Sequence, residues 1–391
     1  MFKRRTLAHV LVWTSFYDQL AWSPILAWLA VSIGAPEAVF WAASAYSAAN
    51  LFGNIVFGML ADRVDRMAVA GAGLLAMVVT GLAHLLPDST AGLIGVRALH
   101  GLAIAGVAPA AMASVTDGLP RNQRGAAMAR MGLVIAVASM LASAASGRLL
   151  TSLGATASVS VLAVLVGAVG IFTVVIRRWL EPPPARVSAG AEGEPAAGRV
   201  NMPGMLAAAL VAYALMFLQN VLFTAYPLKG HELGLSSATI GMTLSAFGLG
   251  AVIAFVPPLS RAADRWGRHQ PIFVGMALAG AGHLGLAHGA APLAFAAWLF
   301  IYGLGFGLVF PAVSALNADA AGAGRRGVAF GMLSAAFSLG SISGPPVTQA
   351  LSGLASPFAV AGWLALATSG FISLWYYFAV RPAQEAARQS A

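Results

Sequence analysis

The chain has 391 residues, of which 59% are hydrophobic and 9% are charged, and its formal net charge is +9. An ordinary soluble domain carries about 25% charged residues, so this composition excludes a soluble protein and indicates a chain that crosses a membrane many times. The absence of cysteine from the sequence excludes disulfides and thiolate metal sites.

Apolar segments long enough to cross a bilayer follow one another along the chain. A membrane-spanning helix needs about 20 residues, and turn residues or charges separate the segments of that length. The predicted spans are residues 7–32, 37–60, 67–86, 91–115, 125–150, 155–177, 202–226, 236–259, 271–290, 292–318, 327–352 and 357–380. The sequence therefore predicts an all-α integral membrane protein with twelve transmembrane helices.

The composition changes between residues 181 and 201, where prolines, alanines, glycines and glutamates replace the apolar run. Such a segment cannot bury an apolar face, so we expect a flexible linker. It separates an N-terminal half of six spans, residues 1–180, from a C-terminal half of six spans, residues 202–391.

The two halves carry the same rare residues at a constant separation. The separation of Asp62 from Asp264 is 264 − 62 = 202, and the same offset relates six further identical pairs. These pairs are Arg63 and Arg265, Arg66 and Arg268, Pro109 and Pro311, Asp117 and Asp319, Arg124 and Arg326, and Gly125 and Gly327. A duplicated six-helix unit is the layout of a secondary transporter, in which the substrate binds between the halves.

Lysine and arginine are concentrated in the loops on one side of the predicted membrane. Because such loops face the cytoplasm, the bias predicts that both termini and the linker are cytoplasmic. The same bias explains the positive net charge without a nucleic-acid partner. We therefore expect a monomeric, multi-pass protein of the inner cell membrane, in contact with lipid.

A charged loop follows the second span and is echoed after the eighth. The first is Gly58-Met59-Leu60-Ala61-Asp62-Arg63-Val64-Asp65-Arg66, and the second is Ala262-Ala263-Asp264-Arg265-Trp266-Gly267-Arg268. With the twelve spans and the central linker, these loops resemble the major facilitator superfamily and its twelve-helix drug/proton antiporters. Asp65 and Ser260 stand where the family usually has glycine. The resemblance implies the major facilitator fold, with two pseudo-symmetric six-helix halves.

Acidic and basic residues gather at the cytoplasmic ends of the helices. Ion pairs between loops can hold that side closed and break when it opens. The predicted gating residues are Asp62, Arg63, Arg66, Asp117, Arg124, Asp264, Arg265, Arg268, Asp319 and Arg326. The alternative is a solvated charged surface, in which each pair contributes less than about 1 kcal/mol.

Asp18 is the one carboxylate that lies deep in a predicted span, about eleven residues from its start, or roughly 16 Å at about 1.5 Å per residue. A carboxylate at that depth is costly unless it is protonated or paired, and it is a candidate functional group. It is either a proton carrier or a permanently paired structural acid. The offset of 202 relates it to Asn220, so only the N-terminal half would carry the proton.

Apart from Arg130, Arg148 and Arg177, which lie nearer the ends of their spans, Arg97 is the only Lys or Arg within a predicted span. Arg97, His100 and Gly101 share one helical face. The spacing Arg97-x-x-x-Gly101 resembles the fourth-helix motif of the family. Because arginine stays charged, Arg97 can act on the protonation of Asp18 in one conformation and release it in another, or form a static pair with it. His100 is either a second titrating group or a packed residue that bonds a carbonyl.

Polar and aromatic residues within the spans indicate a cavity for an amphiphilic ligand. The predicted cavity residues are Tyr17, Gln19, Trp22, Asn50, Gln219, Asn220, Phe223, Tyr302, Phe306 and Phe310. Span eleven carries Gly331, Gly340 and Gly344-Pro345, a spacing that in exporters of the family belongs to span five. The spacing therefore leaves the direction of transport open, and close helix packing is its other use.

The sequence contains no phosphate-binding loop of the kind that a primary pump uses. It also shows no cofactor motif, metal-ligand cluster or nucleophile–base arrangement, so no enzyme is predicted. The hypothesis is a secondary active transporter that exports a small organic substrate in exchange for protons by alternating access. The alternatives are a proton symporter that imports a metabolite, a uniporter, and a non-transporting membrane receptor, for which two matched moving halves have no use.

Overall fold

The computed structural model describes residues 4–116, 121–180, 201–256, 259, 266–321 and 326–380, and every regular element in these ranges is a helix. For some of these residues, including Asp62, Arg124 and Arg326, only the backbone is described. The prediction of an all-α protein is confirmed.

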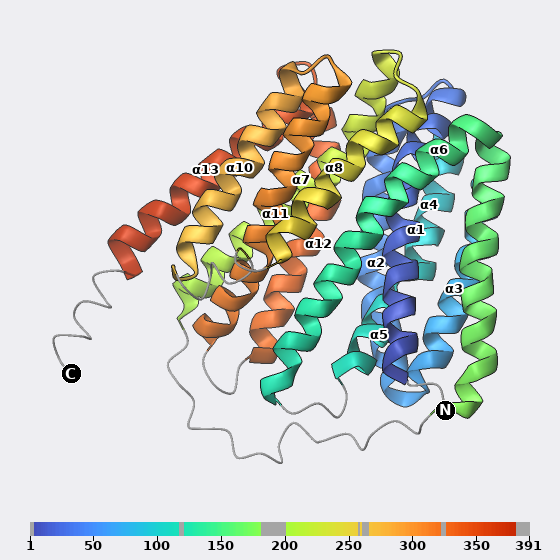
Figure 1. The fold of residues 1–391 in the computed structure, drawn as a ribbon, viewed down its shortest axis with the longest axis horizontal. Helices are drawn as coiled ribbons and strands as arrows, with labels where there is room; N and C mark the ends of the chain where they lie inside the picture. The colour runs from blue at the N-terminus through green and yellow to red at the C-terminus, as the bar shows by residue number, and fades with distance from the viewer. Residues whose placement is uncertain are drawn as a thin grey trace. The chain divides into compact units, whose positions relative to one another are not determined.

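The helices follow one another in the predicted order (Figure 1). Before the predicted linker they are α1 (Arg4–Ser32), α2 (Ala38–Arg63), α3 (Arg66–Ala83), α4 (Thr90–Ile104), α5 (Val107–Thr116), α6 (Arg121–Ile176) and the short η1 (Arg177–Trp179). After it they are α7 (Met202–Glu232), α8 (Ser237–Phe255), α10 (His269–His288), α11 (Pro292–Ala321), α12 (Arg326–Ala350), α13 (Pro357–Trp375) and η3 (Tyr376–Val380).

The boundaries differ from the predicted spans in two places. The span predicted at 91–115 consists of two helices, α4 and α5, whereas the fifth and sixth predicted spans are the two arms of α6. Gly154 lies between these arms, with a φ of 78° and a ψ of 175° that glycine adopts without strain. Figure 1 shows the chain reversing direction between the two arms.

Eight helices of the described residues are long and apolar enough to cross a membrane when residues 130–179 of α6 and η1 are counted together. The second arm of α6 and the helices α1, α2 and α12 match the other four predicted spans in position. Side chains at three loop positions cap the helices that follow them: Asp65 caps α3, Ser89 caps α4 and Ser356 caps α13.

The chain forms two compact units, residues 1–191 with 223–248, and residues 192–222 with 249–391. In the first unit α1 packs on α5 and α6, α2 packs on α4, and α3 packs on α4 and α6. In the second unit α10 packs on α11 and α13. Because residues 181–200 lie outside the described ranges, the linker and the division into halves stay predictions.

Within the first unit, α6 and α8 come so close that their backbones touch. A Cβ atom on Gly147 would overlap the carbonyl oxygen of Ser237, and a Cβ atom on Gly241 would overlap the carbonyl oxygen of Ser143. Small residues allow this approach between membrane helices, because any larger side chain would push the two backbones apart.

Two of the three glycines noted in span eleven have the same use in the second unit. A Cβ atom on Gly340 would overlap the carbonyl oxygen of Tyr213 on α7, and one on Gly344 would lie 2.8 Å from the carbonyl oxygen of Phe217. A Cβ atom on Gly331 would meet nothing within 4 Å. Close packing of α12 on α7 therefore accounts for Gly340 and Gly344, and not for Gly331.

Candidate functional site

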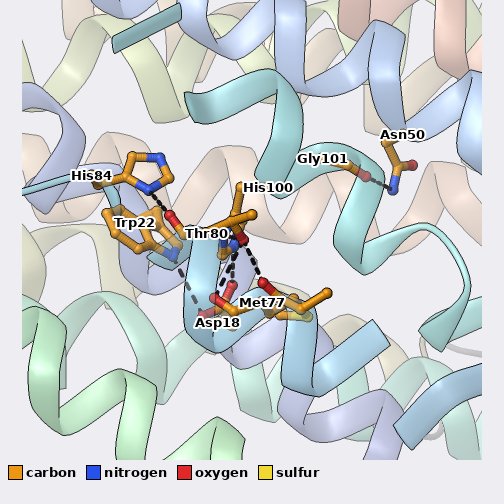
Figure 2. A network of polar contacts seen from close by, with 9 residues as sticks. Asp18, Trp22, Asn50, Met77, Thr80, His84, His100 and Gly101 are labelled. Carbon is orange, nitrogen blue, oxygen red and sulfur yellow. Dashed lines mark hydrogen bonds and ion pairs between the residues drawn. The ribbon is translucent and has the colours of Figure 1, made fainter. Parts of the chain in front are cut away.

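A buried polar cluster in the first unit joins residues of α1, α3 and α4 (Figure 2). Asp18 and His100 have exposed fractions of 3% and 0%, and Nε2 of His100 lies 2.8 Å from Oδ2 of Asp18. On the other side of the ring, Nδ1 of His100 lies 3.0 Å from Oγ1 of Thr80. The indole Nε1 of Trp22 donates to Oδ1 of Asp18 at 3.4 Å. Two residues singled out in the sequence thus form one pair.

The hydroxyl of Thr80 determines how many protons this network holds, because it can donate only one hydrogen bond. When it donates to the carbonyl oxygen of Ala76, 2.9 Å away, it accepts from Nδ1 of His100, and a proton must lie between Nε2 and Asp18. When it donates to Nδ1 instead, the Nε2–H of His100 donates to an ionised Asp18. The two forms are both fully hydrogen-bonded and differ by one proton.

His84 and Trp22 close one side of the cluster. Their ring centroids are 4.1 Å apart, and the His84 ring meets that of His100 edge-on at 5.4 Å. Nδ1 of His84 donates to the carbonyl oxygen of Thr80 at 2.7 Å, whereas Nε2 has no hydrogen-bond partner among the described residues. A single histidine and a single threonine in an apolar segment give no periodic signal, so neither residue could be recognised from the sequence.

Arg97 lies beside the Asp18–His100 pair and is also buried, with an exposed fraction of 5%. Its guanidinium carbon is 4.3 Å from the ring centroid of Tyr46 on α2 and 5.5 Å from that of Trp22. Within the described part of the chain, Arg97 forms no ion pair with Asp18; the nearest base to that carboxylate is His100. In this conformation the interaction with Asp18 that the sequence assigned to Arg97 belongs to His100.

Gly101 sets the position of Arg97. A Cβ atom on Gly101 would overlap the carbonyl oxygen of Tyr46, so α4 touches the backbone of α2 at this point. Asn50 of α2 donates to the carbonyl oxygen of Gly101 at 3.4 Å (Figure 2). Because Arg97 precedes Gly101 by one helical turn, the contact brings the guanidinium over the Tyr46 ring. The Arg97-x-x-x-Gly101 spacing thus has a packing reason.

The predicted cavity residues divide between the two units. Those of the first unit are Tyr17, Gln19, Trp22, Asn50 and Phe223, and those of the second unit are Gln219, Asn220, Tyr302, Phe306 and Phe310. In the first unit, Trp22 contacts Asp18, whereas Tyr17 is half-buried and stacks on Trp13 with centroids 4.8 Å apart. A cavity shared by both sets stays a prediction.

In the second unit, a buried histidine lies among the predicted cavity residues. Nδ1 of His283 is 3.0 Å from the carbonyl oxygen of Ala279, and Nε2 is 3.1 Å from that of Leu218. The His283 ring meets Tyr302 edge-on, with centroids 4.5 Å apart. The repeat offset relates Tyr302 to His100, since 302 − 100 = 202. The duplication therefore links Tyr302, but not His283, to a residue of the Asp18 cluster.

At the predicted cytoplasmic end of the first unit, Nη1 of Arg4 lies 2.9 Å from Oδ1 of Asp65. The same carboxylate oxygen accepts from the backbone N–H of Met67 at 3.4 Å and caps α3. Glycine, which the related loops usually have at this position, can do neither. The departure at Asp65 therefore adds a helix cap and an ion pair to the loop.

Among the predicted gating residues, one ion pair is described in the second unit, where Nε of Arg268 lies 3.0 Å from Oδ2 of Asp319. Subtracting 202 relates this pair to Arg66 and Asp117. Asp117, Asp264 and Arg265 lie outside the described residues, as do the side chains of Asp62, Arg124 and Arg326. Arg63 is exposed and Arg66 is half-buried. Among the described residues, no group of three histidine, aspartate or glutamate side chains is arranged to hold a metal ion.

Comparison with known sequences gives a consistent result. The sequence model of the Major Facilitator Superfamily matches residues 9–219 and 204–391. The chain is also similar to an uncharacterized MFS-type transporter of Mycobacterium tuberculosis, with 31% identity over 116 residues. The match covers 30% of this chain and 20% of that relative, so the chain matches only a small part of that protein's length.

Two solved structures share the fold at low sequence identity. One is a bacterial homolog of the human lysosomal transporter Spinster, in an inward-facing and unoccupied conformation, with a TM-score of 0.68, 14% identity, and coverage of 95% of this chain and 94% of that chain. The other is a mutant peptide transporter, POT, in complex with sulfate, with a TM-score of 0.70, 16% identity, and coverage of 94% of both chains.

Proposed function

This chain belongs to the major facilitator superfamily, and we propose that it is a proton-coupled secondary transporter of a small, amphiphilic organic substrate. The substrate crosses the cell membrane by alternating access, and Asp18 and His100 carry the proton. Export in exchange for protons is the proposed direction, with both termini in the cytoplasm.

The network of Asp18, His100 and Thr80 carries this proposal. It is buried, it lies in one unit, and it has two hydrogen-bonded forms that differ by one proton. A proton can therefore enter or leave the network while every polar atom of it stays hydrogen-bonded. Leaving a buried donor or acceptor unpaired would cost about 1–3 kcal/mol. Opening one side of the protein to water would connect the pair to that side.

Arg97 supports proton symport as a second candidate function. When the proton is bound, Asp18, His100 and Arg97 together are net positive, and when it is absent they are neutral. A substrate with a negative charge binds better to the proton-loaded form, so the proton and substrate move together. A neutral or cationic substrate gains nothing from that form, and exchange is then the favoured coupling.

Proteoliposomes that hold a pH-sensitive dye test the proposal and separate its alternatives. Amphiphilic cations, neutral compounds and acids are added outside in turn, with protein-free liposomes as the control for passive diffusion. We expect at least one compound to change the internal pH in a protein-dependent way. Alkalinisation indicates exchange and acidification indicates symport. Protein-dependent uptake of labelled compounds with no pH change would leave uniport and contradict proton coupling.

The Asp319→Asn variant tests the proposed gate. Asp319 has an exposed side chain, so its pair with Arg268 contributes less than about 1 kcal/mol to stability. We expect an unchanged melting temperature and a several-fold lower transport rate, because the pair stabilises one conformation of the cycle. Asp88→Asn, which removes an exposed carboxylate between α3 and α4, should retain the full rate. Equal rates for Asp319→Asn and the wild type would show that the pair is a solvated surface contact.

A further inference from the structure

The guanidinium of Arg97 has hydrogen-bond donors that no protein group accepts. Its Nε and Nη1 atoms are buried and have no hydrogen-bond partner among the described residues. The hydroxyl of Tyr46 beside it is also buried and has no hydrogen-bond partner among those residues. Burying an unpaired donor of a charged group costs more than the 1–3 kcal/mol or so of a neutral one. The rings of Tyr46 and Trp22, over which the guanidinium carbon lies, attract its charge but supply no hydrogen-bond acceptor oxygen.

The neighbouring acid does not satisfy these donors. Both carboxylate oxygens of Asp18 are engaged, Oδ2 by His100 and Oδ1 by Trp22. Neither oxygen accepts from Nε or Nη1 of Arg97, which have no hydrogen-bond partner among the described residues. His100 therefore binds Asp18, whereas the Nε and Nη1 donors of Arg97 remain available to an acceptor that is not part of the cluster.

We propose that Arg97 and Tyr46 form a binding site for the carboxylate of the substrate, and that the substrate is an amphiphilic organic acid. A planar guanidinium is suited to oxyanions, and the Tyr46 hydroxyl supplies a further donor. The rings of Tyr46 and Trp22 surround the charge, which suits a ligand that carries an apolar group next to its carboxylate.

This inference rests on the proposed transport function, because the donors are covered in this structure and alternating access must expose them. A carboxylate in this site favours the symport candidate over exchange, since it adds a negative charge to the cluster that is net positive with its proton bound.

Binding to the purified full-length protein at constant pH tests the site. The probes are phenylbutyrate, its neutral amide, phenylbutylamine and inorganic sulfate, followed by octanoate with its amide. The readouts are saturable quenching of tryptophan fluorescence and the rise in melting temperature. We expect each carboxylate to bind about tenfold or more tightly than its own amide, the difference that a charge-assisted hydrogen bond gives. The amine should bind no better than the amide.

Variants of the two proposed binding residues, Arg97 and Tyr46, provide the second part of the binding test. Tyr46→Phe removes one hydroxyl and little volume, and it should weaken carboxylate binding several-fold while leaving amide binding unchanged. Arg97→Lys keeps the charge and loses the planar donor set, and it should weaken carboxylate binding more. Arg148→Gln, which removes an exposed arginine from α6, is the matched control and should bind like the wild type.

Three outcomes would overturn the inference. They are equal binding of each carboxylate and its amide, wild-type carboxylate binding by both Tyr46→Phe and Arg97→Lys, and a response to sulfate that no organic acid matches. If Arg97→Lys does not fold, the Tyr46→Phe variant and the comparison of each carboxylate with its own amide still test whether the carboxylate site exists. Selective carboxylate binding without protein-dependent flux would refute the proposed function and leave the site standing, and flux without carboxylate selectivity would do the reverse.

Discussion

Replacing Asp18 with asparagine will abolish substrate accumulation driven by a pH gradient and will leave substrate exchange at equal pH intact. Asparagine has the same shape and can still hydrogen-bond Nε2 of His100, but it cannot take up a proton. The repeat offset relates Asp18 to Asn220, so an amide at this depth is already tolerated in the second half. We expect at least a tenfold loss of accumulation, because the remaining group, His100, no longer has an acid with which to share the proton.

Flux in proteoliposomes is the measurement, made with an imposed pH gradient and again at equal internal and external pH. Asp88→Asn serves as the control for loss of a carboxylate outside the cluster. If Asp18→Asn still concentrates the substrate against its gradient, Asp18 is a structural acid, and His100 becomes the candidate proton carrier.

Gly101→Ala should disrupt both the proton pair and the carboxylate site with a single methyl group. The new Cβ atom would overlap a main-chain oxygen, that of Tyr46, and no change of rotamer can remove this clash. The helices α2 and α4 must separate, which costs about 1–3 kcal/mol for an overpacked site. Arg97 and His100 move with α4, so we expect a lower melting temperature and at least a tenfold loss of transport, since misplacement by about 1 Å can cost on the order of a hundredfold in rate.

Gly95→Ala is the matched control for this change. It lies on the same helix, and a Cβ atom there would meet nothing within 4 Å. Because alanine favours a helix over glycine by about 0.5–1 kcal/mol, this variant should be as stable as the wild type or more so. Similar melting temperatures and transport rates for Gly101→Ala and Gly95→Ala would show that α4 does not depend on the close contact at Tyr46.

The spans and the buried charges could be predicted from the sequence because both depend on local composition. Asp18, Arg97 and His100 are conspicuous in a segment that is otherwise apolar, and the cost of burying them indicates function whatever their neighbours are. The partner of Asp18 could not be predicted in this way. Arg97 and His100 share a face of α4, and the packing of α4 against α1, which carries Asp18, decides which of them reaches it.

Tyr46, Thr80 and His84 were missed for a related reason. Helices that are apolar on all sides give no period from which to infer which face meets which neighbour. Each of these residues is an isolated polar side chain whose importance comes from a contact with another helix. Asp65 illustrates the opposite case, because its role as a cap of α3 follows from its position directly before that helix.

At the contact of α6 with α8, Gly147 and Gly241 place no side chain between the two backbones. Helices that pack by ridges and grooves resist sliding, because each ridge must climb out of its groove before it can move along. Where two glycine backbones meet directly, no ridge stands between them. At these two glycines α6 and α8 can therefore slide past each other more easily than helices with interlocked side chains. Small sliding movements of packed helices are a recognised way for proteins to open and close.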